Sequence, residues 1–535
     1  MASALVSDTA GSGLTPRVVW AFALLVVLLA AGAAGRGMND IPLDSHEIYV
    51  AQTAENMLVS GDWLVPRLNG EYRLTKPPLS YWLVAGTARL TGHTQVGPGV
   101  ARLPSLAAMI GIALLVFWLG LRLFDGPTAV VATLMCVGSL ASFKYGHSAR
   151  PDTLYAFWST AILAAWVGGQ QARVSRQAAW AWSLWGLFAL ASLTKGPQAP
   201  AILLLGVLVH ALAAGQRPRL LLRQLRPLRG IALVLLVTLP WYLLLRHAIG
   251  SQTLADSQLS GQLLTIDPWR IVTPFYLLHA PILWLPWSLL LPAAVIAAWR
   301  DARGPAGLLA VTLIVAMLAF ALGPQYREIY MLPWLAPAML MLANAVMRTS
   351  RTWLALAVIV VAAAAALAWL AYQSGAAATI AILPASLLLL AAIDGLRRRQ
   401  APRAAALAAA AIALGLYQGG AVPALWSPRR YAERAFVHTL ARRIDSTTPI
   451  IVWDFDPAVY SYYLDRPVTG SEALARVCDW IDRRSRDLVL VYPYKRRQEL
   501  ARRLDVVPMW PDARSEFQAA HLPRGTTCHE TRSLD

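Results

Sequence analysis

Long apolar runs separated by short polar segments fill most of this chain. Each run approaches the roughly 20 residues that a helix needs to cross a bilayer. We predict about thirteen membrane spans, near residues 17–35, 104–121, 128–143, 153–169, 178–193, 198–214, 230–246, 277–299, 305–322, 330–347, 352–371, 377–395 and 404–422. The end of the first run, AAGAAG, also resembles a signal-peptidase site, but we expect the helix to be retained. The pattern predicts an all-α polytopic membrane protein.

Two segments break this pattern. Residues 36–103 are polar, and within them 50–59 and 79–90 have the spacing of amphipathic helices that lie on a membrane surface. From Ser427 onward the sequence predicts a helix, then two short buried strands at 450–455 and 487–492 with helix between them. We therefore divide the chain into a transmembrane domain, 1–425, and a small C-terminal α/β domain, 426–535.

Composition and charge agree with a membrane protein. Of the 535 residues 57% are hydrophobic and 14% are charged, whereas soluble proteins have about 25% charged residues. The net charge of +18 is not a sign of nucleic-acid binding, because most arginines lie in alternate short loops, as the positive-inside rule requires. These are Arg122, Arg173, Arg176, Arg217, Arg219, Arg223, Arg226, Arg229, Arg300, Arg303, Arg348, Arg351, Arg397, Arg398, Arg399 and Arg403.

The arginine loops predict the orientation of the chain. If their side is cytoplasmic, an odd number of spans leaves the N-terminus in the cytoplasm and the C-terminal domain outside. The outer loops are then 36–103, 144–152, 194–197, 247–276 and 323–329. In an outer tail, Cys478 and Cys528 can form a disulfide, whereas Cys136 lies within a span. Trp82, Trp284 and Trp287 fit the aromatic belt at the membrane surface.

The outer loops also hold the candidate chemistry. Only four of the 47 basic residues are lysines, and three of these fall in predicted outer loops, where they either bind phosphate or anchor span ends. If they bind phosphate, group transfer from that phosphate would need a base for the acceptor and cations for the leaving phosphate. The candidate acids and bases are Asp44, His46, Glu47 and Asp152, and the candidate phosphate-binding residues are Arg67, Lys76, Arg150, Lys195, Arg327 and Tyr330. Because no cluster has metal-ligand spacing, we expect no metal or other cofactor.

Several motifs in order resemble one family. They are Gly61-Asp62-Trp63, Lys76-Pro77, Ala149-Arg150-Pro151-Asp152, Leu193-Thr194-Lys195-Gly196, and Arg327 followed by Tyr330-Met331-Leu332-Pro333. This series resembles the membrane glycosyltransferases of GT-C type that use polyprenyl-phosphate sugars, such as aminoarabinose transferases acting on lipid A and protein mannosyltransferases. The resemblance covers about residues 40–345.

The resemblance implies a transferase of the bacterial inner membrane with its C-terminal domain in the periplasm. Its donor would be an undecaprenyl-phosphate sugar, and its acceptor lipid A, another glycolipid, a glycan or a protein; no nucleic acid is expected. Asp44 or Glu47 would be the base, and Lys76, Arg327 and Lys195 would hold the phosphate. In strict register the acidic pair of the family falls on His46 and Glu47, and Thr75 replaces a glutamate that holds a metal in some relatives.

Two other functions compete with this one. A glycan polymerase or ligase would place its key residues in a large late outer loop, whereas here the first loop is the rich one. A lipid-linked sugar transporter or flippase would carry ionisable groups inside its spans, but here the spans are nearly free of charge. The sequence therefore favours chemistry at the outer surface.

Overall fold

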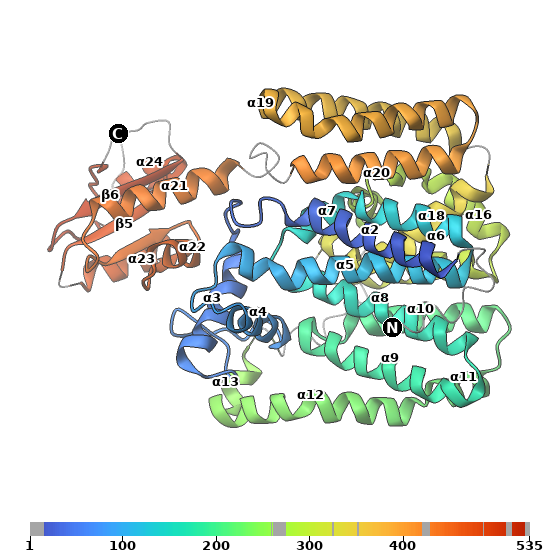
Figure 1. The fold of residues 1–535 in the computed structure, drawn as a ribbon. Coiled ribbons are helices and arrows are strands. Elements are labelled where there is room, and N and C mark those ends of the chain that lie inside the picture. Colours follow the sequence, from blue (N-terminus) through green and yellow to red (C-terminus); the bar gives the residue numbers. More distant parts are fainter. Residues whose placement is uncertain are drawn as a thin grey trace.

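The computed structural model describes residues 15–257, 259, 274–323, 326–349, 352–419, 428–484, 486–509 and 516–529. A bundle of roughly parallel and antiparallel helices occupies one side of the molecule and a small α/β domain the other (Figure 1). Half of the predicted outer loop 247–276, namely 258 and 260–273, and the predicted domain boundary at 425–426 lie outside the described residues.

The bundle helices follow the predicted spans closely, because each apolar run ends at a proline, a glycine or an arginine. They are α2 (Pro16–Gly35), α5 (Pro98–Leu123), α6 (Gly126–Val137), α7 (Leu140–Gly146), α8 (Pro151–Gln171), α9 (Val174–Lys195), α10 (Gln198–Ala213), α11 (Pro218–Leu225), α12 (Pro227–Ile249), α13 (Ser251–Ala255), α15 (Phe275–Leu283), η2 (Trp287–Leu290), α16 (Leu291–Arg300), α17 (Pro305–Ala321), η3 (Glu328–Trp334), α18 (Leu335–Arg348), α19 (Trp353–Arg397) and α20 (Ala401–Gly419).

Length and hydropathy identify fewer spans than the sequence pattern did. Among the described helices, four are long and apolar enough to cross a membrane: Pro98–Leu123, Pro218–Ile249, Glu328–Arg348 and Trp353–Leu370. Two bent pairs, α6 with α7 and Trp287–Arg300 with α17, would raise this number to six. The protein is thus a multi-pass membrane protein, and the total of about thirteen spans stays a prediction.

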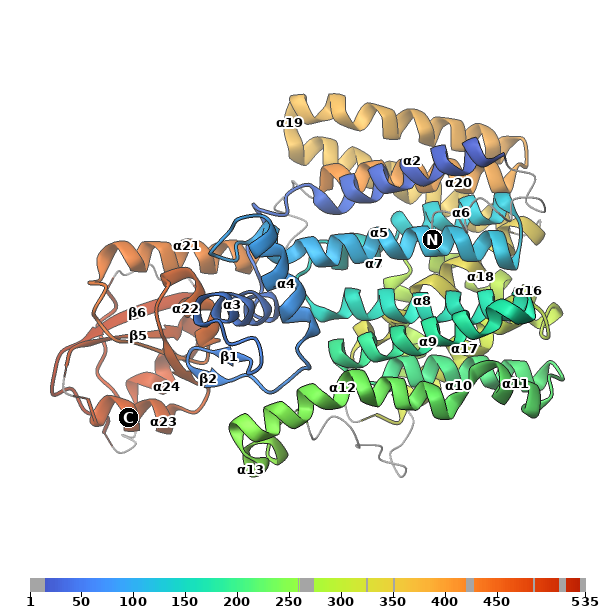
Figure 2. The ribbon, with the colours of Figure 1, turned by 60° about the horizontal axis from the view of Figure 1, so that its bottom comes forward.

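Two predicted spans, 352–371 and 377–395, fall in the single element α19. Its ribbon runs out beside α20 and back again in both views, so its two halves lie next to each other as two spans would (Figures 1 and 2). The predicted span 128–143 is instead broken into α6 and α7, which meet at an angle of 51°. Gly138 lies at this break.

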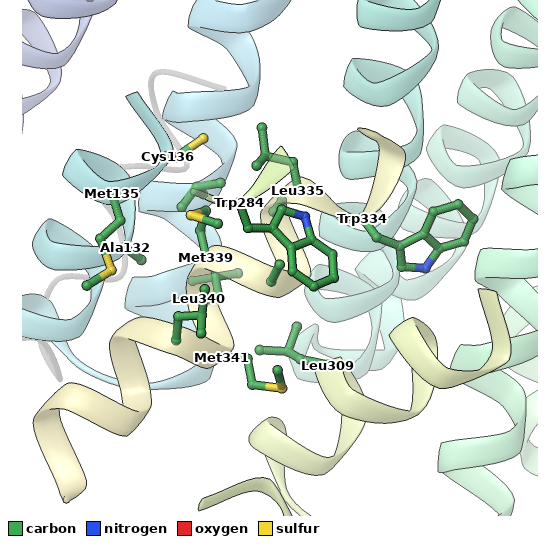
Figure 3. Close-up of a cluster of buried hydrophobic side chains, with 14 of the residues drawn as sticks. Ala132, Met135, Cys136, Trp284, Leu309, Trp334, Leu335, Met339, Leu340 and Met341 are labelled. Carbon is green, nitrogen blue, oxygen red and sulfur yellow. The ribbon is translucent and has the colours of Figure 1, made fainter. Parts of the chain in front are cut away.

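Large aromatic and sulfur side chains fill the centre of the bundle. Trp284 lies beside Leu335 and Met339 of α18, and Trp334, which belongs to the same buried cluster, lies apart from Met339 and Leu340 (Figure 3). Trp284 and Trp287 are 1% and 0% exposed. The prediction that these two tryptophans belong to an interfacial belt is therefore wrong: the turn between α15 and η2 directs them into the bundle, where their large apolar area is buried.

Charge separates the two ends of the bundle. Helix α11, which carries Arg219 and Arg223, lies at the end farthest from the α/β domain, as does the connection between α19 and α20 (Figures 1 and 2). The acidic first loop lies at the opposite end, against the α/β domain. These two arginine-bearing segments and the first polar loop thus lie at opposite ends of the bundle, and which end faces the cytoplasm stays a prediction.

The first polar loop folds into two helices and a short hairpin between the bundle and the α/β domain (Figure 2). They are α3 (Ser45–Ser60), β1 (Arg67–Leu68), β2 (Glu71–Tyr72) and α4 (Leu79–Leu90). Helix α4 begins and ends at the predicted residues, and α3 extends the predicted 50–59 toward its N-terminus. Gly61, in the left-handed conformation with φ 71°, ends α3, as C-terminal glycines do.

The C-terminal domain is an α/β unit, as predicted. Its sheet has the order β4-β3-β5-β6, with β3 parallel to β4 and to β5 and with β6 antiparallel at one edge. The strands are β3 (Ile450–Trp453), β4 (Thr469–Ser471), β5 (Leu488–Pro493) and β6 (Phe517–Leu522). The helices are α21 (Pro428–Arg443), α22 (Pro457–Leu464), α23 (Leu474–Asp482), η6 (Tyr494–Arg496) and α24 (Arg497–Ala501). The strands are short apolar runs because both faces of the sheet are covered.

Polar contacts fix this domain on the first polar loop. The hydroxyl of Tyr49 on α3 donates to Asp456, and the hydroxyl of Ser461 on α22 donates to Asn69 in the hairpin at 2.7 Å. The backbone N–H of Leu43 donates to the hydroxyl of Tyr463 at 3.1 Å. These bonds join residues 392 to 420 positions apart, so the domain and the loop form one structural unit.

A disulfide between Cys478 and Cys528 closes a separation of 50 residues within the domain. A covalent loop of this length restricts the unfolded chain and stabilises the fold by about 4 kcal/mol. We expect Cys478→Ser to leave the bundle folded but to make the C-terminal domain unfold and be cleaved by protease at lower denaturant concentrations. Limited proteolysis of the full-length protein measures this, with the buried Cys136→Ser as control. Equal protection of both variants would contradict the prediction.

Candidate active site

The site begins at the N-terminus of α3, where the sequence Asp-Ser-His-Glu forms a capping box. Asp44 is the N-cap residue: its carboxylate accepts from the backbone N–H of Glu47 at 2.9 Å, and the Glu47 carboxylate accepts from the N–H of Asp44 at 3.0 Å. Reciprocal bonds of this kind satisfy two donors that the first turn of a helix leaves unpaired. The capping box fixes the direction in which Asp44, His46 and Glu47 leave the helix.

Glu47 is fully buried and forms an ion pair with Arg102 of α5, also fully buried. Arg102 Nε and Nη2 donate to the two carboxylate oxygens at 2.8 and 3.1 Å, and the N–H of Ala149 donates to one of them at 2.9 Å. The remaining Arg102 donors bind the carbonyls of Met38, Ile41 and Pro42. This arrangement holds three chain segments together and leaves Glu47 poorly placed to take a proton from a substrate.

Asp44 stays partly exposed and is bound by Arg430 from the C-terminal domain. Arg430 Nη2 lies 2.7 Å from Asp44 Oδ2, and Nη1 lies 3.4 Å from Glu47 Oε2. The guanidinium group thus joins α21 to the acidic start of α3. Charged pairs at this distance hold both side chains in place.

A second group of charges forms where α8 begins and α9 ends. Asp152, in the first turn of α8, accepts a hydrogen bond from Lys195, the last residue of α9. Arg150 Nε lies 4.0 Å from the same carboxylate. The Lys195 ammonium group also lies 4.8 Å from the ring centre of Tyr330, within reach of a cation–π contact. The three motifs at 149–152, 193–196 and 327–333, all assigned to outer loops or their adjoining spans, therefore meet in space.

Lys76 completes the group of cations. Burial and the neighbouring charge of Lys195 lower its pKa to about 8, with smaller contributions from Arg327 and Arg73 in the same direction. Asp152 acts in the opposite direction. Because the neighbouring cations lower the pKa of Lys76, the site is short of negative charge, and a phosphate would supply that charge.

His46 lies between the two groups of charges. Burial and the charges of Arg150 and Arg327 lower its pKa, whereas Asp44 and Asp152 raise it. The net effect keeps the imidazole neutral at pH 7, so that one ring nitrogen has a free electron pair for a proton. His46 occupies the position of the principal acid in the strict register of the resembling family.

Two further predicted phosphate-binding residues, Arg327 and Arg67, lie in different parts of the structure. Arg327, directly before η3, is exposed, and its charge lowers the pKa of both His46 and Lys76. Arg67 instead lies in the hairpin, where it stacks on Tyr72 at 4.7 Å and lies 4.0 Å from Asp62. These contacts give Arg67 a role in the hairpin and set it apart from the cluster of Lys76, Arg150, Lys195 and Arg327.

The sequence did not point to Arg102 or Arg430. Arg102 falls at the end of the first polar loop, and its position before a span gave no reason to expect a buried ion pair. Arg430 is separated from Asp44 by 386 positions, and one arginine among many in the tail carries no signal. Among the described residues, no group of three or more His, Cys, Asp and Glu side chains is placed to hold a metal ion.

Comparison with known proteins shows which family model and which solved structures this chain resembles. Residues 75–243 match the family model described as dolichyl-phosphate-mannose-protein mannosyltransferase. The fold is that of ArnT from Cupriavidus metallidurans, whose structure bound to undecaprenyl phosphate superposes with a TM-score of 0.73 at 19% identity, covering 94% of this chain and 97% of that one. An oligosaccharyltransferase from Archaeoglobus fulgidus gives a TM-score of 0.51 at 13% identity, covering 89% of this chain and 70% of that one.

Curated relatives are similar to this chain in sequence. The chain is 32% identical over 314 residues to the undecaprenyl phosphate-alpha-4-amino-4-deoxy-L-arabinose arabinosyl transferase of Edwardsiella ictaluri, covering 57% of this chain and 55% of the relative. It is 29% identical over 340 residues to the enzyme of the same name in Pseudomonas aeruginosa strain LESB58, covering 58% of each chain. The chain thus matches just over half the length of these relatives. The resemblance to membrane glycosyltransferases that use polyprenyl-phosphate sugars is confirmed.

Proposed function

We propose that the protein is a glycosyltransferase of the bacterial inner membrane that moves a sugar from undecaprenyl phosphate to lipid A or another envelope acceptor at the periplasmic face. The observation that carries the proposal is the convergence of Lys76, Lys195 and Arg327 beside Asp152 and His46 at the end of the bundle that faces the α/β domain. Relatives named for undecaprenyl-phosphate aminoarabinose support this donor class.

In this proposal the cations receive the leaving phosphate. The bond between the anomeric carbon and the phosphate oxygen breaks, and its electron pair stays on the phosphate. Lys76, Lys195, Arg150 and Arg327 offset the charge that develops there, and Tyr330 positions Lys195. Because these groups are held in place before the reaction, little reorganisation is needed in the transition state.

The proton of the acceptor goes to His46. The imidazole is neutral at pH 7 and is influenced by the charges of Arg150, Arg327 and Asp152. Glu47, in contrast, is committed to Arg102 and Asp44 to Arg430. The negative charge of Asp44 favours the imidazolium ion that forms when His46 accepts the proton. Asp44 therefore acts on the reaction through His46, and Asp152 through Lys195.

A deletion strain tests the function. Envelope lipids of the wild-type, the deletion strain and the complemented strain are compared by mass spectrometry. We expect a glycolipid that differs by the mass of one pentose-sized or hexose-sized sugar to disappear on deletion and to return on complementation. Accumulation of a polyprenyl-phosphate sugar on one membrane face, with all glycolipids unchanged, would instead favour the flippase.

The proposed base gives a pH prediction. Since the pKa of His46 is lowered, activity falls only when the pH drops below the ordinary histidine value of about 6.5. We expect His46→Gln to lose about 10²- to 10⁴-fold in turnover. His46→Asp restores a base and retains more activity, with its acid limb moved to lower pH because a carboxylate titrates near 4. A His46→Gln variant with full activity would remove His46 from the reaction.

A further inference from the structure

A polar cleft lies between the start of α3 and the C-terminal domain, next to the site described above. Its volume is about 520 Å³, within the range of roughly 300–1,000 Å³ that small-ligand sites occupy. Helix α22 of the domain lies beside α3 in both views (Figures 1 and 2), and Arg430 of α21 reaches Asp44 at the start of α3. Two residues that line the cleft, Asp44 and Ser45, directly precede His46.

The cleft opens at the carboxyl ends of parallel strands. Asp454, Phe455 and Asp456 follow β3, and Ser471 and Glu472 lie at and beyond the end of β4. Open α/β sheets bind their ligands at this edge, where the loops diverge from the strands. The sheet therefore presents to the first polar loop the edge that such domains use for binding.

The charges of the cleft are unbalanced. Its walls carry five carboxylates and two guanidinium groups, namely Asp44, Glu433, Asp454, Asp456 and Glu472 against Arg429 and Arg430. Both arginines already have carboxylate partners: Arg430 binds Asp44 at 2.7 Å and Arg429 binds Glu516 at 3.2 Å. Asp454 is paired with Lys495 and Arg496 outside the walls, at 3.6 and 3.1 Å, so the excess negative charge of the cleft comes from Glu433, Asp456 and Glu472. An anionic ligand would thus meet excess negative charge, whereas hydroxyl and ammonium groups would find acceptors.

Glu433 is the wall residue best suited to contact a ligand. It lies on the same face of α21 as Arg429 and Arg430, and it is half-buried. Burial raises its pKa to about 7, against the opposing effect of Arg429. Near neutral pH its carboxyl group therefore exists in both forms and can donate to or accept from a sugar hydroxyl.

From these observations we infer that the cleft binds a sugar ring of the acceptor, one that is neutral or carries an amino group and bears no anionic group at this position. The inference rests on the proposed function, because it gives the acceptor a place on the side of Asp44 and His46 that faces the C-terminal domain. The leaving phosphate occupies the cations at Lys76 and Lys195, so donor and acceptor reach His46 from different groups of residues.

Binding of soluble probes to the purified full-length protein tests the cleft without any turnover. Glucosamine, glucose and glucuronate are compared by saturation-transfer NMR. We expect glucosamine and glucose to bind and glucuronate to bind at least tenfold more weakly. Glu433→Gln weakens glucosamine about tenfold, and Ser471→Trp, which fills the cleft, abolishes binding. Asp479→Asn, an exposed carboxylate of α23 in the same domain, leaves binding unchanged.

Three results would overturn the inference: no probe binds, glucuronate binds best, or Ser471→Trp binds as the wild-type protein does. Displacement of glucosamine by undecaprenyl phosphate would also overturn it, because the sugar would then occupy the donor site. A protein that binds glucosamine in the cleft but changes no envelope lipid refutes the proposed function and leaves the cleft as a sugar site. Normal transfer by Ser471→Trp refutes the cleft alone.

Discussion

Glu47→Gln is expected to destabilise the fold by about 3–5 kcal/mol, because it leaves the Arg102 charge buried without its partner. The loss of stability extends to the segment before α3, since Arg102 also binds the carbonyls of Met38, Ile41 and Pro42. Thermal unfolding of the purified protein, followed by size-exclusion chromatography with fluorescence detection, measures the effect. We also expect a low yield of folded Glu47→Gln protein after purification.

Two further variants separate this structural role from catalysis. Replacing both partners, in Glu47→Leu with Arg102→Met, removes both buried charges and recovers part of the stability. Glu71→Gln is the matched control, because Glu71 lies exposed on β2. If Glu47 were the base, Glu47→Gln would unfold at the wild-type temperature and be inactive. That outcome would refute the assignment of Glu47 to the ion pair.

Lys76→Met is expected to lower turnover by about 10²- to 10³-fold, the usual effect of removing one group that stabilises charge in a transition state. The lysine lies in a buried cluster of cations that lowers its pKa to about 8. Since only the protonated form attracts phosphate, wild-type affinity for the donor falls as the pH rises through this region. A bound phosphate moves the transition to higher pH.

Lys76→Arg provides the sharper test. A guanidinium group stays charged at all accessible pH values, so this variant keeps activity and loses the alkaline decline. Lys495→Met is the control, because Lys495 lies exposed in the C-terminal domain and bonds to Asp454. The rate of undecaprenyl phosphate release is measured across the pH range. Identical alkaline limbs in wild type and Lys76→Arg would show that another group titrates.

The sequence predicted the elements well because local patterns determine them. Apolar runs ended by proline, glycine or arginine gave the bundle helices, and residues 79–90 gave α4 with its bounds correct. Two short apolar runs gave the central strands β3 and β5. The motifs around Lys76, Asp152, Lys195 and Arg327 were assigned to one side of the bundle, and loops on one side of a bundle can lie close together, as these do.

The burial of individual side chains depends on tertiary contacts, which the sequence pattern does not describe. The register of the capping box makes Glu47 face Arg102 and leaves His46 exposed, because a helix of 3.6 residues per turn separates these neighbours by about 100°. Nothing in the spacing of Asp44, His46 and Glu47 tells which of them is buried. The approach of Arg430 depends on how the C-terminal domain docks, and sequence patterns describe elements rather than docking. The tryptophans at 284 and 287 were misjudged for the same reason.

Binding of undecaprenyl phosphate to the purified protein tests the central claim most directly, because this lipid is the common product whatever the sugar and the acceptor are. Native mass spectrometry of the full-length protein with added undecaprenyl phosphate gives the stoichiometry and the relative affinity. We expect one lipid per chain, about tenfold weaker binding in Lys76→Met, and unchanged binding in Lys495→Met. Absent binding, or equal binding in the wild type and Lys76→Met, would contradict a donor-phosphate site at this cluster.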